Sequence, residues 1–498
     1  MNHRLKLLNN SFVFLPVALA ACFFIGKSIT VVPTNFPLAL IFGAAIVLLG
    51  FFYTHYAIII LILAMLLSPE FTIASFPQRD VVVRIEDILL AIFFFVWVTK
   101  MAFVKGKSLF AKTPLNGAIF FYSSVFILVT LRGMMLDYVK PLLGLFYILK
   151  YLEYFLIYFF TCSVISSQKQ MKTYVKALIF TFVIVVLYAT TQIGIGRVSA
   201  PFEGSSGEPN TLGGYLVLLQ GLILGVAAHS NTNRKKIILV SLFLLSLLPF
   251  AFTFSRASYM SFLPMYLVLL FHNRTRNKNM FIGALIIATI FLIYFFPQNV
   301  KERLAHTFTP EDTIDAPAQE ILGIKFGPSS SARIYNWKFM IDQWKYSPLF
   351  GYGITGRGFI DGQYIRILTE MGALGLTAFL IMVITLGRQS LRIYRSTKDE
   401  FYKGVSIGFL AGHMGMMVHC ISTNTFVVLR IMEPYWFIAA LVMSIPMLEK
   451  KEQEEIEIQA KIIEENKEPE IKHPPLDKKK LLANSHFLLQ NGNGVSTH

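Results

Sequence analysis

Arginines beside hydroxyl side chains are the residues of this sequence with the clearest chemical use. Arg256 stands between Ser255 and Ser258 in the segment FTFSRASYMSF, where one apolar stretch ends and another begins. An arginine at membrane depth is costly, which makes it a candidate functional residue. Its rigid fork of donors, with two hydroxyls beside it, suits a phosphate or pyrophosphate group. An arginine that merely extends to the membrane interface is the structural alternative.

A second arginine, Arg333, opens the segment SSSARIYNWKFMIDQW. Ile334, Trp337, Ile341 and Trp344 follow at steps of three and four residues and predict a helix with one apolar face. Because tryptophan favours the membrane interface, we expect this amphipathic helix to lie on the membrane surface or to cap the bundle. An anion is favoured near the N-terminus of such a helix, where Arg333 stands.

A third polar segment, GRVSAPFEGSSGEPNTLGGYL, contains Arg197 and Asn210. We predict that Arg197 contacts the same anion, with an ordinary surface arginine as the alternative. Asn210 directly precedes an apolar run, so it is either a helix cap or part of the site.

The segment GYGITGRGFIDGQYIRILTEMGALG follows the predicted amphipathic helix and has glycines at four early positions. It is not a nucleotide-binding loop, because no strand–helix unit surrounds it. The glycines instead predict sharp turns and close approach of the backbone. Asp361 then precedes a membrane helix that begins with Tyr364, Arg366 and Glu370. So many polar groups at an entrance to the membrane indicate a site, although Asp361 could also be a helix N-cap.

Metal chemistry is not predicted. His413 and His419 stand six residues apart in one span and lack the four-residue spacing of a helical metal pair, and His306 is the one histidine of the large loop. No Ser-His-Asp arrangement is recognisable. The three cysteines all fall in apolar runs and form neither a disulfide framework nor a metal pair: Cys22, Cys162 and Cys420.

The elements that must position these residues are membrane helices. The chain has 498 residues, is 55% hydrophobic and contains 46 phenylalanines; its mean hydropathy is +0.58. Apolar runs of roughly 18 residues or more predict transmembrane helices. We therefore expect an all-α polytopic integral membrane protein with about fourteen spans, and at least twelve. They start near residues 12, 36, 56, 85, 116, 141, 171, 211, 236, 256, 280, 362, 405 and 428.

The charge pattern predicts the orientation. The net charge of +16 is spread over short basic clusters in alternate loops, at 100–112, 169–176, 234–236, 274–278 and 388–398. This pattern indicates membrane topology and not a nucleic-acid surface. With the N-terminus in the cytoplasm, as an uncleaved first span, all these clusters lie inside, and residues 194–210 and 297–360 lie outside.

These expectations divide the chain into four parts. Residues 1–296 form membrane helices 1–11, residues 297–361 form an extracytoplasmic loop, and residues 362–447 form helices 12–14. Residues 448–498 form a charged cytoplasmic tail that is interrupted by Pro474 and Pro475.

The order of these motifs resembles the bacterial O-antigen ligase and O-antigen polymerase superfamily. The shared pattern is Asn210 before a span, SRAS at 255–258, R-x3-W at 333–337, GYG at 351–353 and D-x2-Y-x7-G at 361–372. It covers residues 195–390 well and the other spans only by general pattern.

The resemblance implies a membrane glycosyltransferase of the bacterial cytoplasmic membrane that needs no metal or other cofactor. Such proteins take undecaprenyl-pyrophosphate-linked glycans on the outer side of the membrane, with Arg256 and Arg333 at the pyrophosphate. The candidate supporting residues of this sequence are Asn210, Ser255, Tyr364, Arg366 and Glu370. The acceptor is a growing polysaccharide or lipid A-core. A chain-length regulator, a flippase and membrane lipids are the further partners that the resemblance implies, and nucleic acid is not one.

One departure favours a polymerase over a ligase. The ligases have a histidine eleven residues before the helix glycine, and in this sequence Asp361 stands at that distance from Gly372. An acid at this position is similar to the polymerases, and a carboxylate can act as general base on a sugar hydroxyl.

Two other classes remain as alternatives. A lipid-linked oligosaccharide flippase or other transporter would have more ionisable groups deep in its helices. Lys150 and Glu153 are the main groups of that kind, and they could simply pair one turn apart. The last alternative is a structural assembly protein without chemistry.

Overall fold

The computed structural model describes residues 35–465, with gaps at 77–78, 104–109, 204–206, 322–323, 326 and 359 and over most of 273–318. The spans expected near residues 12 and 280 and the candidate His306 therefore fall outside, or almost wholly outside, the described residues. The chain divides into two compact units, Met1–Leu448 and Glu449–His498.

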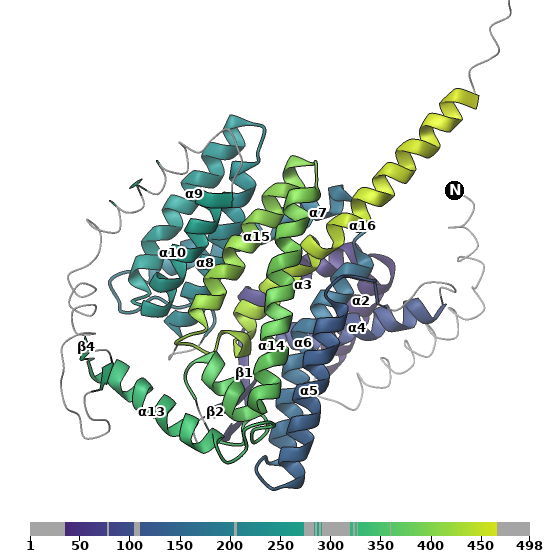
Figure 1. Ribbon diagram of the computed structural model, residues 1–498. Helices are drawn as coiled ribbons and strands as arrows, with labels where there is room; N and C mark the ends of the chain where they lie inside the picture. Colours follow the sequence, from purple (N-terminus) through teal and green to yellow (C-terminus); the bar gives the residue numbers. More distant parts are fainter. Residues whose placement is uncertain are drawn as a thin grey trace, which may run out of the picture. The chain divides into compact units, whose positions relative to one another are not determined.

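The described part of the chain is helical (Figure 1). At every expected span start other than those near 12 and 280, a helix begins within five residues of the predicted position. The helices are α2 (Asn35–Phe52), α3 (Thr54–Leu67), α4 (Ile85–Phe103), α5 (Asn116–Met135), α6 (Pro141–Val164), α7 (Gln168–Thr191), α8 (Pro209–Ala228), α9 (Asn233–Phe252), α10 (Arg256–His272), α13 (Pro328–Trp344), α14 (Gln363–Ser396), α15 (Glu400–His419) and α16 (Leu429–Glu465).

Seven helices of the described part are long and apolar enough to cross a membrane, namely α5, α6, α7, α8, α9, α14 and α16. The protein is therefore a polytopic membrane protein. The expectation of fourteen spans is met only in part, because α3 and α10 are short and the first turn of α4 is acidic. Two antiparallel hairpins were not predicted: β1 (Glu70–Phe76) with β2 (Arg79–Arg84), and β3 (Glu320–Ile321) with β4 (Ile324–Lys325).

Helices α8 and α15 form the centre of the bundle, with α10 beside them (Figure 1). Their backbones touch through glycines, as membrane helices do when small residues line the contact. A Cβ added to Gly225 would lie 2.4 Å from Cα of Gly408, and one added to Gly221 would lie 2.8 Å from the amide of Gly412. The two helices run antiparallel, so the start of α8 meets the end of α15.

Helix α14 is two helices joined at Gly372, whose φ of 68° is left-handed. At this break the amides of Ala373 and Leu374 donate to the carbonyls of Pro348 and Leu349 and not to the preceding turn. The carbonyls that they leave, of Thr369 and Glu370, accept from the amides of Tyr352 and Gly353. The turn 348–353 therefore takes the place of one helical turn, as the glycines of GYG predicted.

Helix α13 occupies the segment where the amphipathic helix was expected, and it packs on α14. Ile334 is buried, but Trp337, Ile341 and Trp344 of the predicted apolar face are only half-buried. Tyr335 and Phe339, on another side, are about half exposed. The predicted apolar face of α13 is therefore less buried than its sequence indicated.

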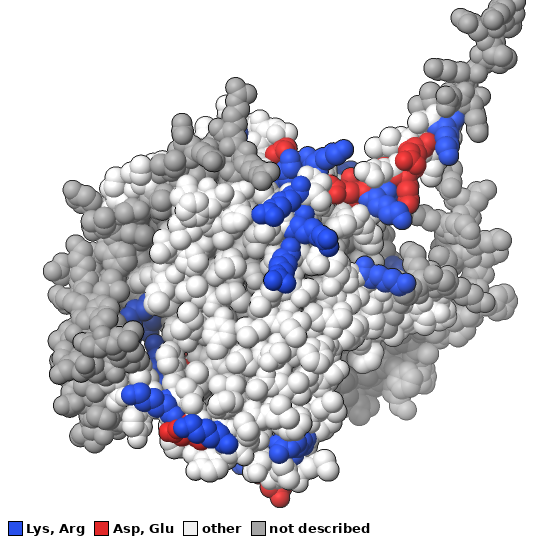
Figure 2. All heavy atoms as spheres, viewed as in Figure 1, with Lys and Arg blue, Asp and Glu red and all other residues white. Residues whose placement is uncertain are grey.

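The starts of α7 and α15 and the ends of α8, α10 and α14 lie together at one end of the bundle, called the basic end below. His229 after α8 bonds Glu400 at 2.8 Å, Lys172 of α7 lies over the ring of Phe401, and Tyr394 near the end of α14 donates to the carbonyl of His272. The starts of α8, α10 and α14 and the end of α15 lie at the opposite end, called the loop end. Figure 2 shows charged side chains at two ends of the described surface, with a wide face between them that has none in this view.

This grouping makes the predicted orientation testable with two cysteines. Tyr346, 81% exposed beside the break in α14, marks the loop end, and the exposed Lys398 marks the basic end. Tyr346→Cys should react with a membrane-impermeant thiol reagent in intact cells or spheroplasts, whereas Lys398→Cys should react only after lysis. The unsubstituted chain gives the background, and the reverse labelling pattern would invert the topology.

Candidate functional site

The structure brings the three predicted anion-binding arginines together at the loop end. Arg197, Arg256 and Arg333 line one small cavity of about 50 Å³, with Asn210 and Thr423 also in its wall. They come from the loop before α8, the first turn of α10 and α13, which are far apart in the sequence. Three guanidinium groups around one cavity form a strongly positive site that suits a phosphate or diphosphate.

Each arginine is held by polar groups of the protein. Arg256 donates from Nη1 to Oγ of Ser330 at 3.0 Å, and Arg197 donates from Nε to the carbonyl of Thr253 at 3.2 Å. Arg333 forms an ion pair with Asp361, with 3.3 Å between Nε and Oδ2. Arg197 and Arg256 thus meet neutral carbonyl and hydroxyl groups, and Arg197 also interacts electrostatically with Glu208.

The two serines beside Arg256 have a structural role. Ser255 donates to Oδ1 of Asn210 at 2.7 Å, and Ser258 donates to Oγ of Ser255 at 2.8 Å. These bonds fasten the start of α10 to the start of α8, so the hydroxyls do not line the arginine cavity as expected. The alternative that Asn210 caps α8 is wrong, because Glu208 occupies the N-cap position and Asn210 accepts the bond from Ser255.

Asp361 stands between two cavities. Its carboxylate meets Arg333, and it also lines a second cavity of about 200 Å³ whose wall shares Asn210 and Thr423 with the arginine cavity. Its carbonyl accepts a bond of 2.6 Å from Nε1 of Trp337, which fixes the turn before α14. The helix-cap alternative is wrong here as well, since Gly362 is the N-cap and no side chain caps α14.

Arg366 and Glu370 form a buried ion pair on α14, with 3.1 Å between Nε and Oε2. The other carboxylate oxygen of Glu370 accepts from the amide of Thr355 at 3.0 Å, so this acid is committed to the fold. Arg366 lines the second cavity, and its buried Nη2 has no hydrogen-bond partner among the described residues. An unsatisfied buried donor is costly, so this atom marks a position for an oxygen of a ligand.

Tyr364, the remaining predicted support, donates to the carbonyl of Met417 at 2.8 Å and lines neither cavity. It joins α14 to α15.

Four other residues of the second cavity were not predicted as site residues. His419, Thr423 and Asn424 come from the end of α15 and the turn after it, and Asn424 donates to the carbonyl of Ile360 at 2.6 Å. Glu208, in the loop before α8, is the fourth. Partial desolvation raises the pKa of Glu208, and the nearby carboxylate of Asp361 raises it further. The polar run STNT at residues 422–425, which follows a predicted span, is the feature of the sequence that could have indicated this turn.

One group of carboxylates in the described residues has the spacing of metal ligands: Glu86, Asp87 and Glu433. Arg84 bonds Glu86 at 2.8 Å and lies 3.7 Å from Glu433, and Lys150 bonds Asp87. Lys150 and Glu153 also pair, at 3.2 Å, as predicted. Arg84 and Lys150 therefore compensate Glu86 and Asp87, whereas the carboxylate oxygens of Glu433 have no hydrogen-bond partner among the described residues.

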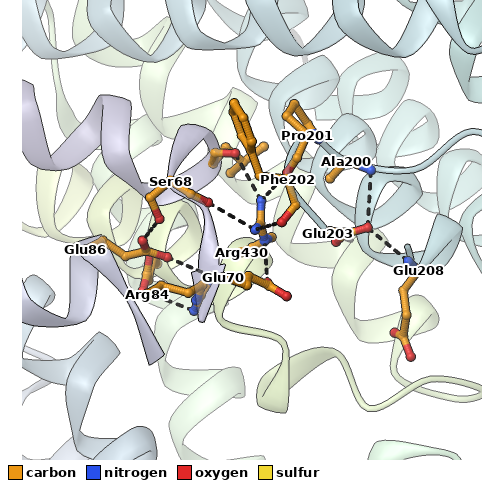
Figure 3. A network of polar contacts seen from close by, with 12 residues as sticks. Ser68, Glu70, Arg84, Glu86, Ala200, Pro201, Phe202, Glu203, Glu208 and Arg430 are labelled. Atoms are coloured by element: carbon orange, nitrogen blue, oxygen red, sulfur yellow. Dashed lines mark hydrogen bonds and ion pairs between the residues drawn. The ribbon is translucent and has the colours of Figure 1, made fainter. Parts of the chain in front are cut away.

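Arg430 joins the end of α3 to the loop before α8 (Figure 3). Its guanidinium is 3% exposed and bonds Glu70 through Nε at 3.0 Å. Nη1 and Nη2 donate to four carbonyls, two at the end of α3 and two in the loop before α8: Leu66, Ser68, Pro201 and Phe202. Arg430 therefore fixes the loop that runs from Arg197 to Asn210.

Arg430→Met should destabilise the protein strongly, because it removes a buried donor from four carbonyls and a carboxylate. Breaking a buried ion pair costs about 3–5 kcal/mol. Thermal unfolding of the purified protein in detergent should therefore begin several degrees lower. Arg388→Met, at an exposed arginine near the basic end of α14, is the matched control. Equal unfolding temperatures for the two variants would contradict the supporting role of Arg430.

Comparison with known protein families identifies residues 210–380 by the model described as O-antigen ligase. The matched region includes Asn210, Arg256, Arg333, Asp361 and Gly372, and it ends inside α14. No match was found among curated proteins. The resemblance inferred from the motifs is confirmed: this membrane protein contains, at residues 210–380, a domain of the O-antigen ligase family.

Proposed function

We propose that this protein is a membrane glycosyltransferase that polymerises undecaprenyl-pyrophosphate-linked repeat units into a surface polysaccharide. The family consists of ligases and polymerases of lipid-linked glycans. The observation that supports this activity best is the cavity of Arg197, Arg256 and Arg333 directly beside the carboxylate of Asp361. The reaction takes place on the outer face of the bacterial cytoplasmic membrane, with a flippase and a chain-length regulator as partners.

The arginine cavity holds the diphosphate of the donor. During transfer, the bond between the anomeric carbon and the diphosphate oxygen breaks, and undecaprenyl diphosphate leaves with the bonding electrons. Guanidinium groups already in position stabilise this charge as it develops. The leaving group is good enough that the chemistry of the reaction needs no nucleotide.

Asp361 acts on the acceptor. Its carboxylate takes the proton of the acceptor hydroxyl while the oxygen forms the new bond to the anomeric carbon. In the free protein this carboxylate pairs with Arg333. A bound diphosphate competes for Arg333, so binding of the donor releases Asp361 to meet the acceptor. The base therefore becomes available when the donor is in place.

Arg366 completes the site from the second cavity. Its free Nη2 can donate to an oxygen of the transferred or the accepting sugar, while Glu370 holds its other side. The pair is rigid because both side chains are buried on one face of α14. It orients the substrate and takes no proton.

Transfer to lipid A-core is the second candidate, favoured by the description of the matching family model. The acid at position 361, where the ligases have a histidine, favours the polymerase. Deletion of the gene distinguishes them: loss of polymer with retention of single lipid-linked repeat units indicates a polymerase. Free lipid-linked polymer with bare lipid A-core indicates a ligase.

A transporter is supported less well. Besides Lys150 and Glu153, other ionisable side chains lie inside the protein, among them Glu86, Arg430 and Glu433. However, Arg84, Lys150 and Arg430 each pair with an acid nearby. Buried charge that is internally paired fits a static scaffold as well as it fits a transport path.

Arg256→Ala and Arg333→Ala should each abolish most polymer, because each removes a donor to the leaving diphosphate. Arg256→Lys should rescue poorly, since a point charge lacks the two-pronged geometry of arginine. The checks are the polysaccharide ladder on gels and the protein level in membranes. Lys338→Ala, on the exposed side of α13, is the control. Normal polymer from both alanine variants would refute the diphosphate site.

Asp361→Asn should insert normally and yield little or no polymer. Loss of a general base lowers the rate by roughly 10²- to 10⁴-fold. The amide keeps the shape of the side chain, and the fold does not use Asp361 as a cap, so stability should change little. Asp342→Asn, at an exposed surface ion pair on α13, is the matched control. Polymerisation near the wild-type rate by Asp361→Asn would remove Asp361 from the reaction.

A further inference from the structure

A third cavity, of about 390 Å³, continues the second one away from the arginines. Tyr147, Glu208 and Thr211 line both, as do Val427 and Val428. Since Asn210 and Thr423 already connect the first two, the three cavities follow one another along one polar groove. The volume of the third lies within the roughly 300–1,000 Å³ typical of small-molecule sites. The groove thus has an arginine end, a centre at Asp361 and a far end.

The cations at the far end are already committed to the protein. Arg84 bonds Glu86, Lys150 bonds Asp87 and Glu153, and Arg430 has five partners. The arginine cavity differs, because three guanidinium groups line it. Among the described residues, the far end has no uncommitted cation that could balance the charge of a second phosphate.

The polar groups that remain available are carboxyl oxygens. Oε2 of Glu203 accepts from the amides of Ala200 and Glu208, at 3.3 and 2.9 Å, and no described residue bonds Oε1 (Figure 3). The carboxyl group of Glu208 accepts no hydrogen bond from the described residues either. Desolvation raises the pKa of Glu203 to about 8, so at neutral pH this group can both donate and accept. Groups that both donate and accept hydrogen bonds can bind the hydroxyls of a sugar.

Aromatic rings form part of the same wall. Phe146, Tyr147 and Tyr151 lie on α6 and line the far end, and Tyr147 extends to the central cavity. Rings beside hydrogen-bonding groups are the usual composition of a site for an amphipathic small molecule. A sugar, with apolar C–H faces and hydroxyl edges, has this chemistry.

We propose that the far end of the groove binds the acceptor glycan, with Glu203 and Glu208 on the hydroxyls of an uncharged sugar and Tyr147 beside its ring. This inference rests on the proposed function. It gives the site a direction: the donor diphosphate lies at the arginines, the attacking hydroxyl lies at Asp361, and the rest of the acceptor lies toward α6. A uronic acid at this position is disfavoured, because no uncommitted cation is there to pair with it.

Two probes test the proposal on the purified full-length protein in detergent. Undecaprenyl pyrophosphate reports on the donor end. The repeat-unit oligosaccharide, released by mild acid from lipid-linked units that accumulate in the deletion strain, reports on the acceptor end. Val428→Trp fills the passage between the centre and the far end, and Glu208→Gln changes one carboxyl group at constant shape. Leu128→Trp, on an exposed face of α5, is the control.

Val428→Trp should weaken oligosaccharide binding at least tenfold and leave the affinity for undecaprenyl pyrophosphate unchanged. Glu208→Gln should weaken oligosaccharide binding about three- to tenfold, the usual effect of one hydrogen bond. Arg256→Ala should have the opposite effect: it should lose affinity for undecaprenyl pyrophosphate and keep its affinity for the oligosaccharide. Retained lipid binding also shows that the variants at the far end are folded.

Unchanged oligosaccharide binding by both far-end variants, with lipid binding lost in Arg256→Ala, would overturn the acceptor site and leave the proposed function intact. If Arg256→Ala binds undecaprenyl pyrophosphate normally, or if the deletion strain accumulates no lipid-linked oligosaccharide, the proposed function itself fails.

Discussion

The guanidinium of Arg430 holds the loop end of the bundle together. All its donor groups are used, on segments that lie more than two hundred residues away in the sequence. In a membrane protein, a backbone that leaves helical structure must find its hydrogen bonds inside the protein or in water. Arg430 supplies such bonds to two places at once, the end of α3 and the loop before α8. The position of that loop determines where Arg197 and Glu208 stand.

The site is built from the ends of helices and the turns beside them. The starts of α8, α10 and α14 and the end of α15 meet there, and each contributes polar side chains close to its end. Close glycine packing between α8 and α15 sets how near those ends come. The cavities of the candidate site are therefore lined by residues at or near these helix ends.

Local patterns in the sequence predicted the helices well. Apolar runs and basic clusters placed most span starts and grouped the loops at two ends, because those signals depend on neighbouring residues only. The arginines were found for a similar reason, since each stands out at the boundary of an apolar run. Their convergence on one cavity could only be conjectured from the resemblance.

The errors concern partners that are distant in the sequence. Ser255 was expected to meet the ligand, but it bonds Asn210 across 45 positions, and Asn210 lines both cavities without capping α8. Thr423, Asn424 and Arg430 were not singled out from the sequence at all. Strands β1 and β2 lie in the short segment between the spans expected near residues 56 and 85, where no strand was predicted. Contacts of this kind depend on how helices pack, and periodicity along one chain does not encode that.

The exchange of hydrogen bonds at Gly372 has a practical consequence for recombining members of this family. The turn 348–353 and the two halves of α14 form one bonded unit, in which each part supplies the partners that another lacks. A chimaera joined within this unit, for instance at Gly362, would combine a turn from one parent with a helix break from another and leave their backbone groups mismatched. Junctions placed before α13 and after Leu374 would transfer the unit whole. The stretch from α13 to the break in α14 is therefore the natural module for exchange between relatives, whatever glycan each parent uses.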